Sequence, residues 1–398
     1  MLTLSAAAFL ATLGVCAHIP YTDGGYVNLP GDLADLRYLG IDQVRDGLSS
    51  GANGSASLQS YIFLAEHGIK FTLVTEQSST EGLTAYMEAV DRLQQEVPGS
   101  VQAVEGPNEI NNWPVTYNGV KGLAGALLLQ SAIYTYVKSD PQLRGVKVVY
   151  MTGYPGGSPD PTKTPGLADF DNQHPYPNFG QPPHLWVRRE ALGNTTDPEA
   201  PAVFTETGYT TAQVNPQVQA KYLLDLYFDA ASLGITRTFV YELKDAYAPK
   251  SRVGDAGWGL FEGFGTRQGD RDTPKPAAVA IHNLTTLLAD YGTAKIGKVR
   301  LQISGLPASG NTLLIEKSDG TDYLVVWAEP VIWWNRANIV IPAPEAPVTV
   351  TLPASQADVR VFDPLTGTAP VAEYTHVTQI RLRVTDHPLL VAFGRPTS

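Results

Sequence analysis

The feature that most constrains the fold is a regular alternation of strand-like and helix-like segments between about residues 15 and 290. Strands that alternate with helices indicate βαβ units, which build a parallel sheet with right-handed crossovers. Eight such units in about 275 residues predict a (β/α)8 barrel, a fold that typically has about 250 residues. The eight runs predicted as strands are Val15–Ile19, Ile41–Val44, Lys70–Val74, Val101–Val104, Val146–Met151, Phe170–His174, Ala202–Thr205 and Thr238–Tyr241. The helices predicted between them include Leu83–Gln95, Leu123–Lys138, Gln217–Leu233 and Pro276–Ala289.

An open, doubly wound sheet is the alternative within the same α/β class. Many such sheets bind dinucleotides through a Gly-rich G-x-G-x-x-G turn after the first strand. No such turn follows the first predicted strand here. The sequence therefore favours the closed barrel over the open sheet.

The pattern changes after about residue 295, where short apolar runs follow one another without helices between them. Ser318–Thr321 contains the Asp-Gly pair that is typical of tight hairpins. Strands at this spacing predict an all-β sandwich, so we divide the chain into a barrel, residues 1–294, and a β-sandwich, residues 295–398. The strands predicted in the sandwich are Thr312–Glu316, Tyr323–Trp327, Asn338–Ile341, Thr349–Leu352, Val359–Phe362, Gln379–Val384 and Leu389–Ala392.

Composition and charge exclude several classes of partner. The single cysteine, Cys16, rules out an intrachain disulfide framework and a cysteine-built metal site. A balance of 28 basic against 39 acidic residues gives a net charge of −11, which repels nucleic acid. No run of 18 apolar residues occurs, so we expect no membrane span. The seven histidines are scattered, and we expect neither a metal nor another cofactor.

The N-terminal stretch Leu2–Ala17 is apolar enough to resemble a secretory signal. However, no Lys or Arg precedes the apolar part, and export signals normally carry a positive segment there. We therefore interpret the stretch as a short helix, Ala6–Leu13, that ends at Gly14 and leads into the first strand. A secreted or periplasmic location is still the expectation, with an export signal outside this sequence.

Two glutamates follow predicted strands at positions where a barrel carries its chemistry. Catalytic groups of such barrels project from the C-terminal ends of the strands. Glu109 follows the fourth strand, directly after Asn108, and Glu206 follows the seventh, 97 residues later. Three βα units of about 30 residues each account for that separation, so the two carboxylates can converge on one pocket. Such a pair is what cleavage of a glycosidic bond needs, with one group protonated and the other ionised.

Further side chains at strand ends fit a sugar site around these glutamates. Arg45 ends the second strand, and a guanidinium lowers the pKa of a neighbouring carboxylate. Each of these residues also has a structural interpretation, since Arg45 can pair with Asp46 and a strand-end Glu can complement a helix dipole. The residues predicted to contact the sugar are His18, Arg45, Asn108, His174, Tyr176, Tyr209, Tyr241, Glu242 and Trp258. Trp333 and Trp334 in the sandwich are interpreted as domain-packing residues rather than as a sugar platform.

The motifs Gly106–Glu109, Phe204–Gly208 and His174–Tyr176 resemble those of clan A glycoside hydrolases. Similarity is greatest to the branch with a barrel and a β-sandwich, which includes β-xylosidases, iduronidases and bacterial exopolysaccharide hydrolases. The resemblance covers about residues 15–290 and implies a retaining enzyme for oligo- or polysaccharides. It implies that Glu109 is the acid/base and Glu206 the nucleophile.

The same resemblance implies that Asn108 binds the sugar 2-hydroxyl and that His174 or Tyr176 orients Glu206. The sequence departs from the family at Ile110, where many members have proline, and at Tyr241–Leu243, where tryptophan is frequent. Two other functions remain open at this point. One is a non-catalytic carbohydrate-binding protein, and the other is a transglycosylase or lyase that uses the same carboxylates.

Overall fold

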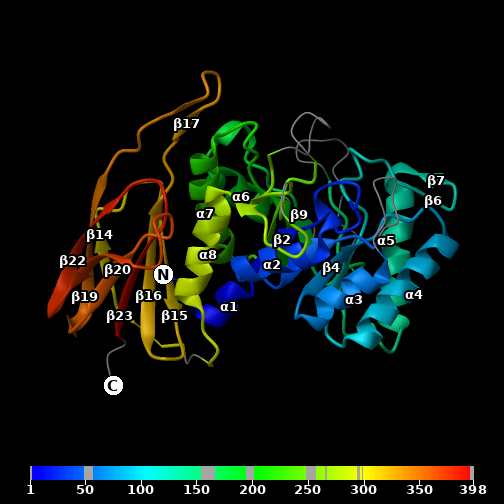
Figure 1. Cartoon of the computed structure of the whole chain (residues 1–398), viewed down its shortest axis with the longest axis horizontal. Helices are drawn as coiled ribbons and strands as arrows, with labels where there is room; N and C mark the ends of the chain where they lie inside the picture. Colours follow the sequence, from blue (N-terminus) through cyan, green and yellow to red (C-terminus); the bar gives the residue numbers. More distant parts are fainter. Residues whose placement is uncertain are drawn as a thin grey trace.

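The structure is a computed structural model that combines a parallel barrel with an antiparallel β-sandwich (Figure 1). It describes residues 2–48, 57–153, 166–193, 201–247, 257–264, 267–293, 296–297 and 299–394. The sandwich lies on one side of the barrel, and helices α1, α7 and α8 lie between the two (Figure 1).

Eight parallel strands form the barrel in the sheet order β8-β5-β4-β3-β2-β11-β10-β9. A parallel bridge between Val149 and Phe170 joins the two end strands, β8 and β9, and closes the sheet. The (β/α)8 prediction is therefore confirmed, and each of the eight predicted runs contains or overlaps one barrel strand. These strands are β2 Leu13–Cys16, β3 Gln43–Asp46, β4 Lys70–Val74, β5 Val101–Glu105, β8 Lys147–Val149, β9 Asp171–Gln173, β10 Ala202–Thr207 and β11 Thr238–Val240.

Helices follow the barrel strands and cover the outside of the barrel, as the alternating pattern predicts. Two of the long ones begin at ordinary helix-start signals: Ser79 caps α4 and Asn215 caps α7 through their side chains. The barrel helices are α2 Leu29–Leu39, α3 Leu58–Glu66, α4 Thr80–Glu96, α5 Gly122–Ser139, α6 Pro183–Gly193, α7 Pro216–Ser232 and α8 Pro276–Leu288. Within the described ranges, no helix has the length and apolar character that crossing a membrane requires.

The start of the chain differs from the prediction in its boundaries. Helix α1 spans Ala6–Leu10 and is shorter than predicted, and the first barrel strand begins at Leu13 rather than at Val15. Gly14 thus lies inside the strand, where a Cβ atom would come within 2.5 Å of the Phe239 ring. The apolar stretch is part of the folded protein, because Phe9 is fully buried.

The sandwich pairs a six-stranded sheet, β1-β15-β16-β23-β20-β21, with a three-stranded sheet, β14-β19-β22. Each of the seven predicted strands overlaps an observed one, and the predicted turn at Ser318–Thr321 joins β15 to β16. The first strand of the chain, β1, runs parallel to β15, so both ends of the sequence contribute to this sheet. The proposed division after residue 294 falls on residues 294 and 295, which lie outside the described ones. The strands are β1 Thr3–Ser5, β14 Gln302–Ser304, β15 Gly310–Glu316, β16 Thr321–Ala328, β19 Ala346–Gln356, β20 Val359–Phe362, β21 Pro370–Tyr374, β22 Val377–Val384 and β23 Leu389–Gly394.

The central strands of the six-stranded sheet are buried on both faces because they lie between the second sheet and the barrel. Alternate residues of β16 divide between the two sides, with Leu324 in the sandwich core and Trp327 in the barrel core. Phe228 of α7 stacks on Phe9 at 4.9 Å between ring centroids and packs against Trp327 at 5.6 Å. Burial of these rings fixes the sandwich to the barrel and predicts one cooperative packing unit.

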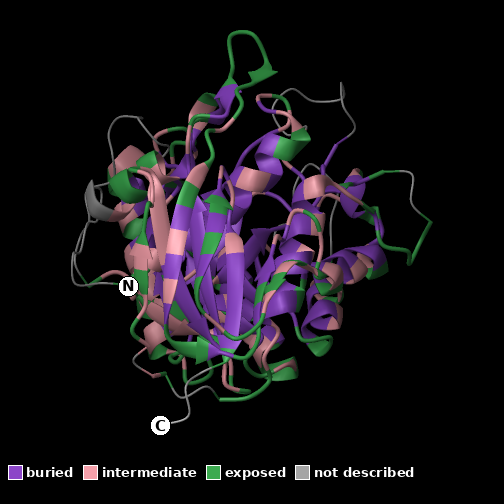
Figure 2. Ribbon diagram, turned by 90° about the vertical axis from the view of Figure 1, so that its left-hand side faces the viewer, coloured by how far each residue is buried: buried purple, intermediate pink, exposed green. Residues whose placement is uncertain are grey.

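A short hairpin, β17 Trp333–Trp334 and β18 Ile339–Val340, projects from the sandwich and is largely exposed (Figure 2). Its two tryptophans have different environments. Trp333 is 7 % exposed and contacts Gly180 of the barrel, so it packs between domains as predicted. Trp334 is 51 % exposed, so the same interpretation does not apply to it.

Candidate active site

The fourth and seventh barrel strands bring Glu109 and Glu206 together at the C-terminal end of the barrel. Glu206 lies inside β10, whereas Glu109 lies four residues beyond the end of β5. The backbone of Glu109 has φ of 41°, a left-handed conformation that non-glycine residues rarely adopt. Thr152 fixes this turn: its hydroxyl accepts from the Glu109 N–H at 3.0 Å, and its carbonyl accepts from Ile110 at 3.0 Å. The segment that follows β8, the next strand of the barrel, therefore fixes the backbone at Glu109.

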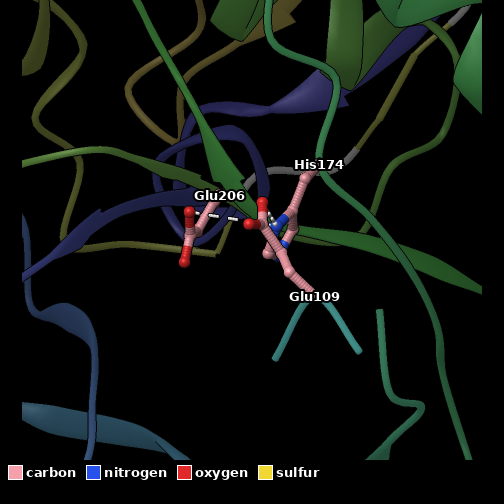
Figure 3. A group of neighbouring side chains, drawn as sticks. All are labelled: Glu109, His174 and Glu206. Atoms are coloured by element: carbon pink, nitrogen blue, oxygen red, sulfur yellow. Dashed lines mark hydrogen bonds and ion pairs between the residues drawn. The ribbon is translucent and has the colours of Figure 1, made fainter. Parts of the chain in front are cut away.

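His174 lies beside both carboxylates and contacts each of them through one nitrogen (Figure 3). Its Nδ1 atom is 3.1 Å from Glu109 Oε1 and 3.8 Å from Glu206 Oε2. One carboxylate oxygen of each glutamate lies within 4.8 Å of the other. Glu109 is 7 % exposed and Glu206 8 % exposed, so both carboxylates lie in a partly closed site.

Arg45, at the end of the second barrel strand, connects Glu206 to Glu105. Its guanidinium donates to both oxygens of Glu105 at 2.9 Å and to Oε1 of Glu206. The same guanidinium donates to Asn108 Oδ1 at 2.8 Å. Burial alone would lower the pKa of Arg45, but Glu105 and Glu206 outweigh it and raise this pKa. Arg45 is therefore a permanent cation under the glutamate pair.

The surroundings of Glu206 favour its ionised form. Burial raises the pKa of Glu206, but His174, Arg45 and the Tyr176 hydroxyl outweigh it and bring the pKa below its ordinary value. The Tyr176 hydroxyl donates to Oε2 at 2.8 Å, so each carboxylate oxygen of Glu206 accepts a hydrogen bond. Glu206 is consequently a carboxylate at neutral pH.

Thr205 determines which nitrogen of His174 carries a hydrogen. The Thr205 hydroxyl lies 2.9 Å from Glu105 Oε1 and 2.9 Å from Asn172 Oδ1, and both of these oxygens are acceptors. Its single hydrogen is thus used, and only a lone pair can face His174 Nε2, which is 2.9 Å away. Nε2 must therefore donate. A neutral His174 then has an unprotonated Nδ1, which faces Glu109.

Aromatic side chains form one wall beside Glu206. Trp258 contacts Tyr176 edge-on at 5.2 Å and Tyr241 at 5.8 Å between ring centroids. The Tyr241 hydroxyl lies 3.0 Å from His18 Nε2, and Glu242 Oε2 lies 3.5 Å from the same nitrogen. Burial lowers the pKa of His18 to about 4, so His18 is neutral at pH 7. Aromatic rings of this kind can stack on a sugar ring through their faces.

The structure connects most of the predicted site residues in one network but leaves one outside it. Tyr209 is 2 % exposed, its ring packs on Tyr222 of α7 at 5.3 Å, and its hydroxyl donates to the Gln181 carbonyl. Its ring faces are therefore used in the core, and the structure contradicts the expectation that Tyr209 stacks on a sugar. Glu242 is fully buried and does not face solvent. It belongs to the network through the contact of its Oε2 atom with His18 Nε2. The predicted residues in the network are His18, Arg45, Asn108, Glu109, His174, Tyr176, Glu206, Tyr241, Glu242 and Trp258.

The sequence interpretation missed the residues that support the site from within the strands. Glu105 and Thr205 are fully buried, and Asn172 donates to Glu105 Oε1 at 3.3 Å. Polar residues at inward positions next to a strand end are the signal that indicates them, because a buried strand normally carries apolar residues there.

Glu109, His174 and Glu206 are also the one group in the described part of the chain whose ligand atoms approach closely enough for a metal ion. The surrounding charges disfavour that use. Both oxygens of Glu206 already accept from Arg45 and Tyr176, and the guanidinium would repel a divalent cation. The group is better suited to hold protons than a metal.

Comparisons with known proteins were made by family model, by sequence and by structure. No family model matches the chain, and no curated protein sequence matches it. Solved structures do match. A family 39 glycoside hydrolase from the gut symbiont Bacteroides cellulosilyticus WH2 is similar with a TM-score of 0.65 at 16 % identity, covering 96 % of this chain and 81 % of that one.

Two further structures are similar over nearly the whole of both chains. A monomeric β-xylosidase from Caulobacter crescentus CB15 has a TM-score of 0.59 at 14 % identity, with 97 % of this chain and 96 % of that one covered. The GH39 enzyme from Xanthomonas axonopodis pv. citri has a TM-score of 0.59 at 15 % identity, with 99 % and 97 % covered. The chain therefore has the barrel-and-sandwich fold of these enzymes.

Proposed function

We propose that this protein is a retaining glycoside hydrolase in which Glu206 is the nucleophile and Glu109 the acid/base. The observation that carries the proposal is the approach of the two carboxylates within 4.8 Å, with His174 Nδ1 close to both. Retaining glycosidases hold their carboxyl groups about 5–5.5 Å apart, whereas inverting ones leave about 6.5–9.5 Å for a water molecule. The fold shared with glycoside hydrolases supports this assignment.

In the first step, Glu206 attacks the anomeric carbon while Glu109 gives a proton to the departing oxygen. The bond from the sugar to the leaving group breaks, and a glycosyl ester of Glu206 forms. The ion pair with Arg45 and the hydrogen bond from Tyr176 keep Glu206 ionised and fix its direction. Formation of the ester removes the negative charge of Glu206. Both contacts therefore stabilise the carboxylate before the attack more than they stabilise the ester.

His174 shares a proton with Glu109, the other glutamate of the pair. Because Nε2 donates to Thr205, one proton is shared between His174 Nδ1 and Glu109, across 3.1 Å. In the first step this proton lies on Glu109, from which it passes to the departing oxygen. In the second step, Glu109 is a carboxylate that takes a proton from water, and this water hydrolyses the glycosyl ester.

Side chains around the pair suggest how the sugar is held. Asn108 accepts from Arg45 through Oδ1, so its amide N–H₂ remains as a donor for a sugar hydroxyl. Trp258 and Tyr241 provide aromatic surface beside Glu206. Since two of the similar structures are described as β-xylosidases, xylosides are the first substrates to test. We also propose the secreted or periplasmic location expected from the sequence, which suits a glycan substrate.

The experiment that tests the proposal uses Glu206→Ala with an activated aryl glycoside, chosen from a panel by wild-type turnover. Added azide should enter the space left by the side chain, restore turnover and give a glycosyl azide of inverted anomeric configuration. Glu109→Ala is the matched control, since azide should then give a product of retained configuration. Near-wild-type turnover of Glu206→Ala without azide would remove the nucleophile assignment.

Product analysis with the wild type separates the other functions considered. Free sugar with retained configuration supports hydrolysis, a longer oligosaccharide indicates transfer, and an unsaturated sugar indicates a lyase. Glycan binding without any product would favour a carbohydrate-binding protein.

A further inference from the structure

The barrel interior contains a second site candidate, on the side opposite to the glutamates. A cavity of about 220 Å³ lies among the lower parts of five barrel strands. Its wall combines apolar side chains with neutral polar groups and two cations. The lining residues are Thr72, Gln102, Ala103, Lys147, Val149, Phe170, Val203, Thr205, Thr236, Arg237 and Phe239.

The cavity exists because small side chains occupy inward positions of the barrel. Barrels of this type are normally filled by layers of bulky side chains, so the interior is a packed core. Here Ala103, Val149 and Val203 form a small cluster of buried residues, with Phe170 packed against it. Three side chains of modest size leave the centre of this layer open.

Exposure shows where the cavity opens. The lining residues at the amino-terminal ends of the strands, such as Lys147 and Thr236, are exposed, whereas Thr205 at the inner end is fully buried. The opening is therefore on the amino-terminal face of the barrel. Thr205 separates the inner end from His174 and the glutamate pair, so this cavity is distinct from the proposed active site.

The charge at the opening is positive. Both charged residues of the lining, Lys147 and Arg237, are cations. The Nε atom of Arg237 is buried and lacks a hydrogen-bond partner among the described residues. Asp42, the acid that acts electrostatically on Arg237, is paired with Lys70 at 2.7 Å. Apart from Lys147 and Arg237, the lining is neutral. A guanidinium with an unused N–H donor at the rim of such a cavity is suited to bind a carboxylate.

We propose that this cavity binds a small monocarboxylate with an apolar tail. Its carboxylate pairs with Arg237 and Lys147 at the opening, and its tail lies against Ala103, Val149 and Phe239. An apolar cavity of about 150 Å³ accommodates benzene, so this larger one accommodates a chain of about six carbons. A sugar is a poorer match, because its many hydroxyls would face an apolar wall.

The test is titration calorimetry with hexanoate, 1-hexanol and hexylamine on the whole protein, repeated by ligand-observed NMR. These probes share one chain length and differ in charge. Saturable binding of hexanoate, at least about fivefold tighter than 1-hexanol and with no binding of hexylamine, supports the proposal. No saturable binding of hexanoate, or equal affinity for the alcohol or the amine, would overturn it.

Two variants locate the binding. Arg237→Gln should weaken hexanoate binding at least about fivefold, and Ala103→Leu should weaken it as well by occupying part of the cavity. Lys317→Gln, which changes a lysine on the sandwich turn, is the charge control and should bind as the wild type does. Unchanged affinity of Arg237→Gln would refute the site even if Ala103→Leu failed to fold. Glu206→Gln should bind hexanoate normally, so the result does not depend on the proposed glycosidase activity.

Discussion

The two ends of the barrel interior are built in opposite ways. At the carboxyl end, Arg45, Glu105 and Glu206 form a continuous layer of buried ion pairs, extended by Thr205 and His174. At the amino end, small and neutral side chains leave a cavity of about 220 Å³ with cations only at its opening. The strands carry both layers within a few residues of each other.

This difference shows which end of the barrel interior holds buried charge. Removing one partner of a buried ion pair costs about 3–5 kcal/mol, because the other charge is left without compensation. A buried layer of charges is therefore kept only where each member is paired, and here that layer coincides with the glutamate pair. Among the residues that the structure describes, the opposite layer holds no such network, so substitutions there should affect stability or ligand binding and leave the chemistry intact.

The largest expected effect is that of Glu206→Gln. Loss of the proposed nucleophile should lower kcat by at least about 10⁴-fold, since catalytic groups that act as a unit show losses of this size. The fold should remain, because Gln keeps the side-chain shape and can still accept from Tyr176. Steady-state kinetics on the chosen aryl glycoside, with circular dichroism as the folding control, check this. Activity within tenfold of the wild type would contradict the assignment.

Arg45→Met should reduce both activity and stability. We expect kcat to fall by about 10²–10³-fold, as for the loss of a preorganised charge beside the reacting group. We also expect the free energy of unfolding to fall by about 3–5 kcal/mol, because Glu105 then keeps a buried negative charge without its partner. Kinetics and urea titration measure the two effects.

The pH dependence of the same variant has a definite sign. Arg45 is one of the groups that hold the pKa of Glu206 below its ordinary value. Its removal raises that pKa, so the acid limb of kcat/KM should move to higher pH. An acid limb that stays in place would show that Arg45 does not act on the ionisation of the nucleophile.

Tyr176→Phe and Tyr209→Phe form a matched pair, because each removes one hydroxyl that donates a part-buried hydrogen bond. The first deletes a hydrogen bond to a carboxylate, worth about 1.5–3 kcal/mol, so kcat should fall by about 10–100-fold. The second deletes a bond to the Gln181 carbonyl in the core and should leave kcat within about twofold. Equal losses in both variants would contradict the distinction between site and core.

Thr205→Val tests whether Thr205 orients His174. Without the hydroxyl, His174 Nε2 loses its acceptor and the histidine is free to hold its proton on Nδ1 instead. We expect kcat to fall by about fivefold and Thr205→Ser to restore it. A loss that Ser does not restore would indicate a packing effect only.

The smallest effect on activity is expected at the other end of the barrel. Ala103→Leu fills part of the cavity, so it should raise the free energy of unfolding by about 0.5–2 kcal/mol and leave kcat within about twofold. Thermal and urea unfolding with parallel kinetics check this. A large loss of kcat would show that the two layers are coupled.

Much of the fold was predictable because it follows local patterns. The alternation of strands and helices, the Asp-Gly turn before Thr321 and the strand-end positions of Glu109 and Glu206 each depend on short stretches of sequence. The pairing of β1 with β15 was not predictable, because it joins segments about 310 residues apart. Tyr209 was misplaced for a related reason: it follows a strand, but its contact with Tyr222 depends on how α7 packs. The cavity arises from side-chain sizes on five separate strands, which no single segment indicates.

The central claim, that Glu206 attacks the sugar while Glu109 serves the leaving group, can be tested by trapping the intermediate. The measurement is peptide mapping by mass spectrometry after incubation with an activated 2-deoxy-2-fluoro glycoside of the preferred sugar. The account predicts one glycosyl group, attached to Glu206 within the segment Phe204–Gly208. A glycosyl group on Glu109 or on any other residue would contradict it.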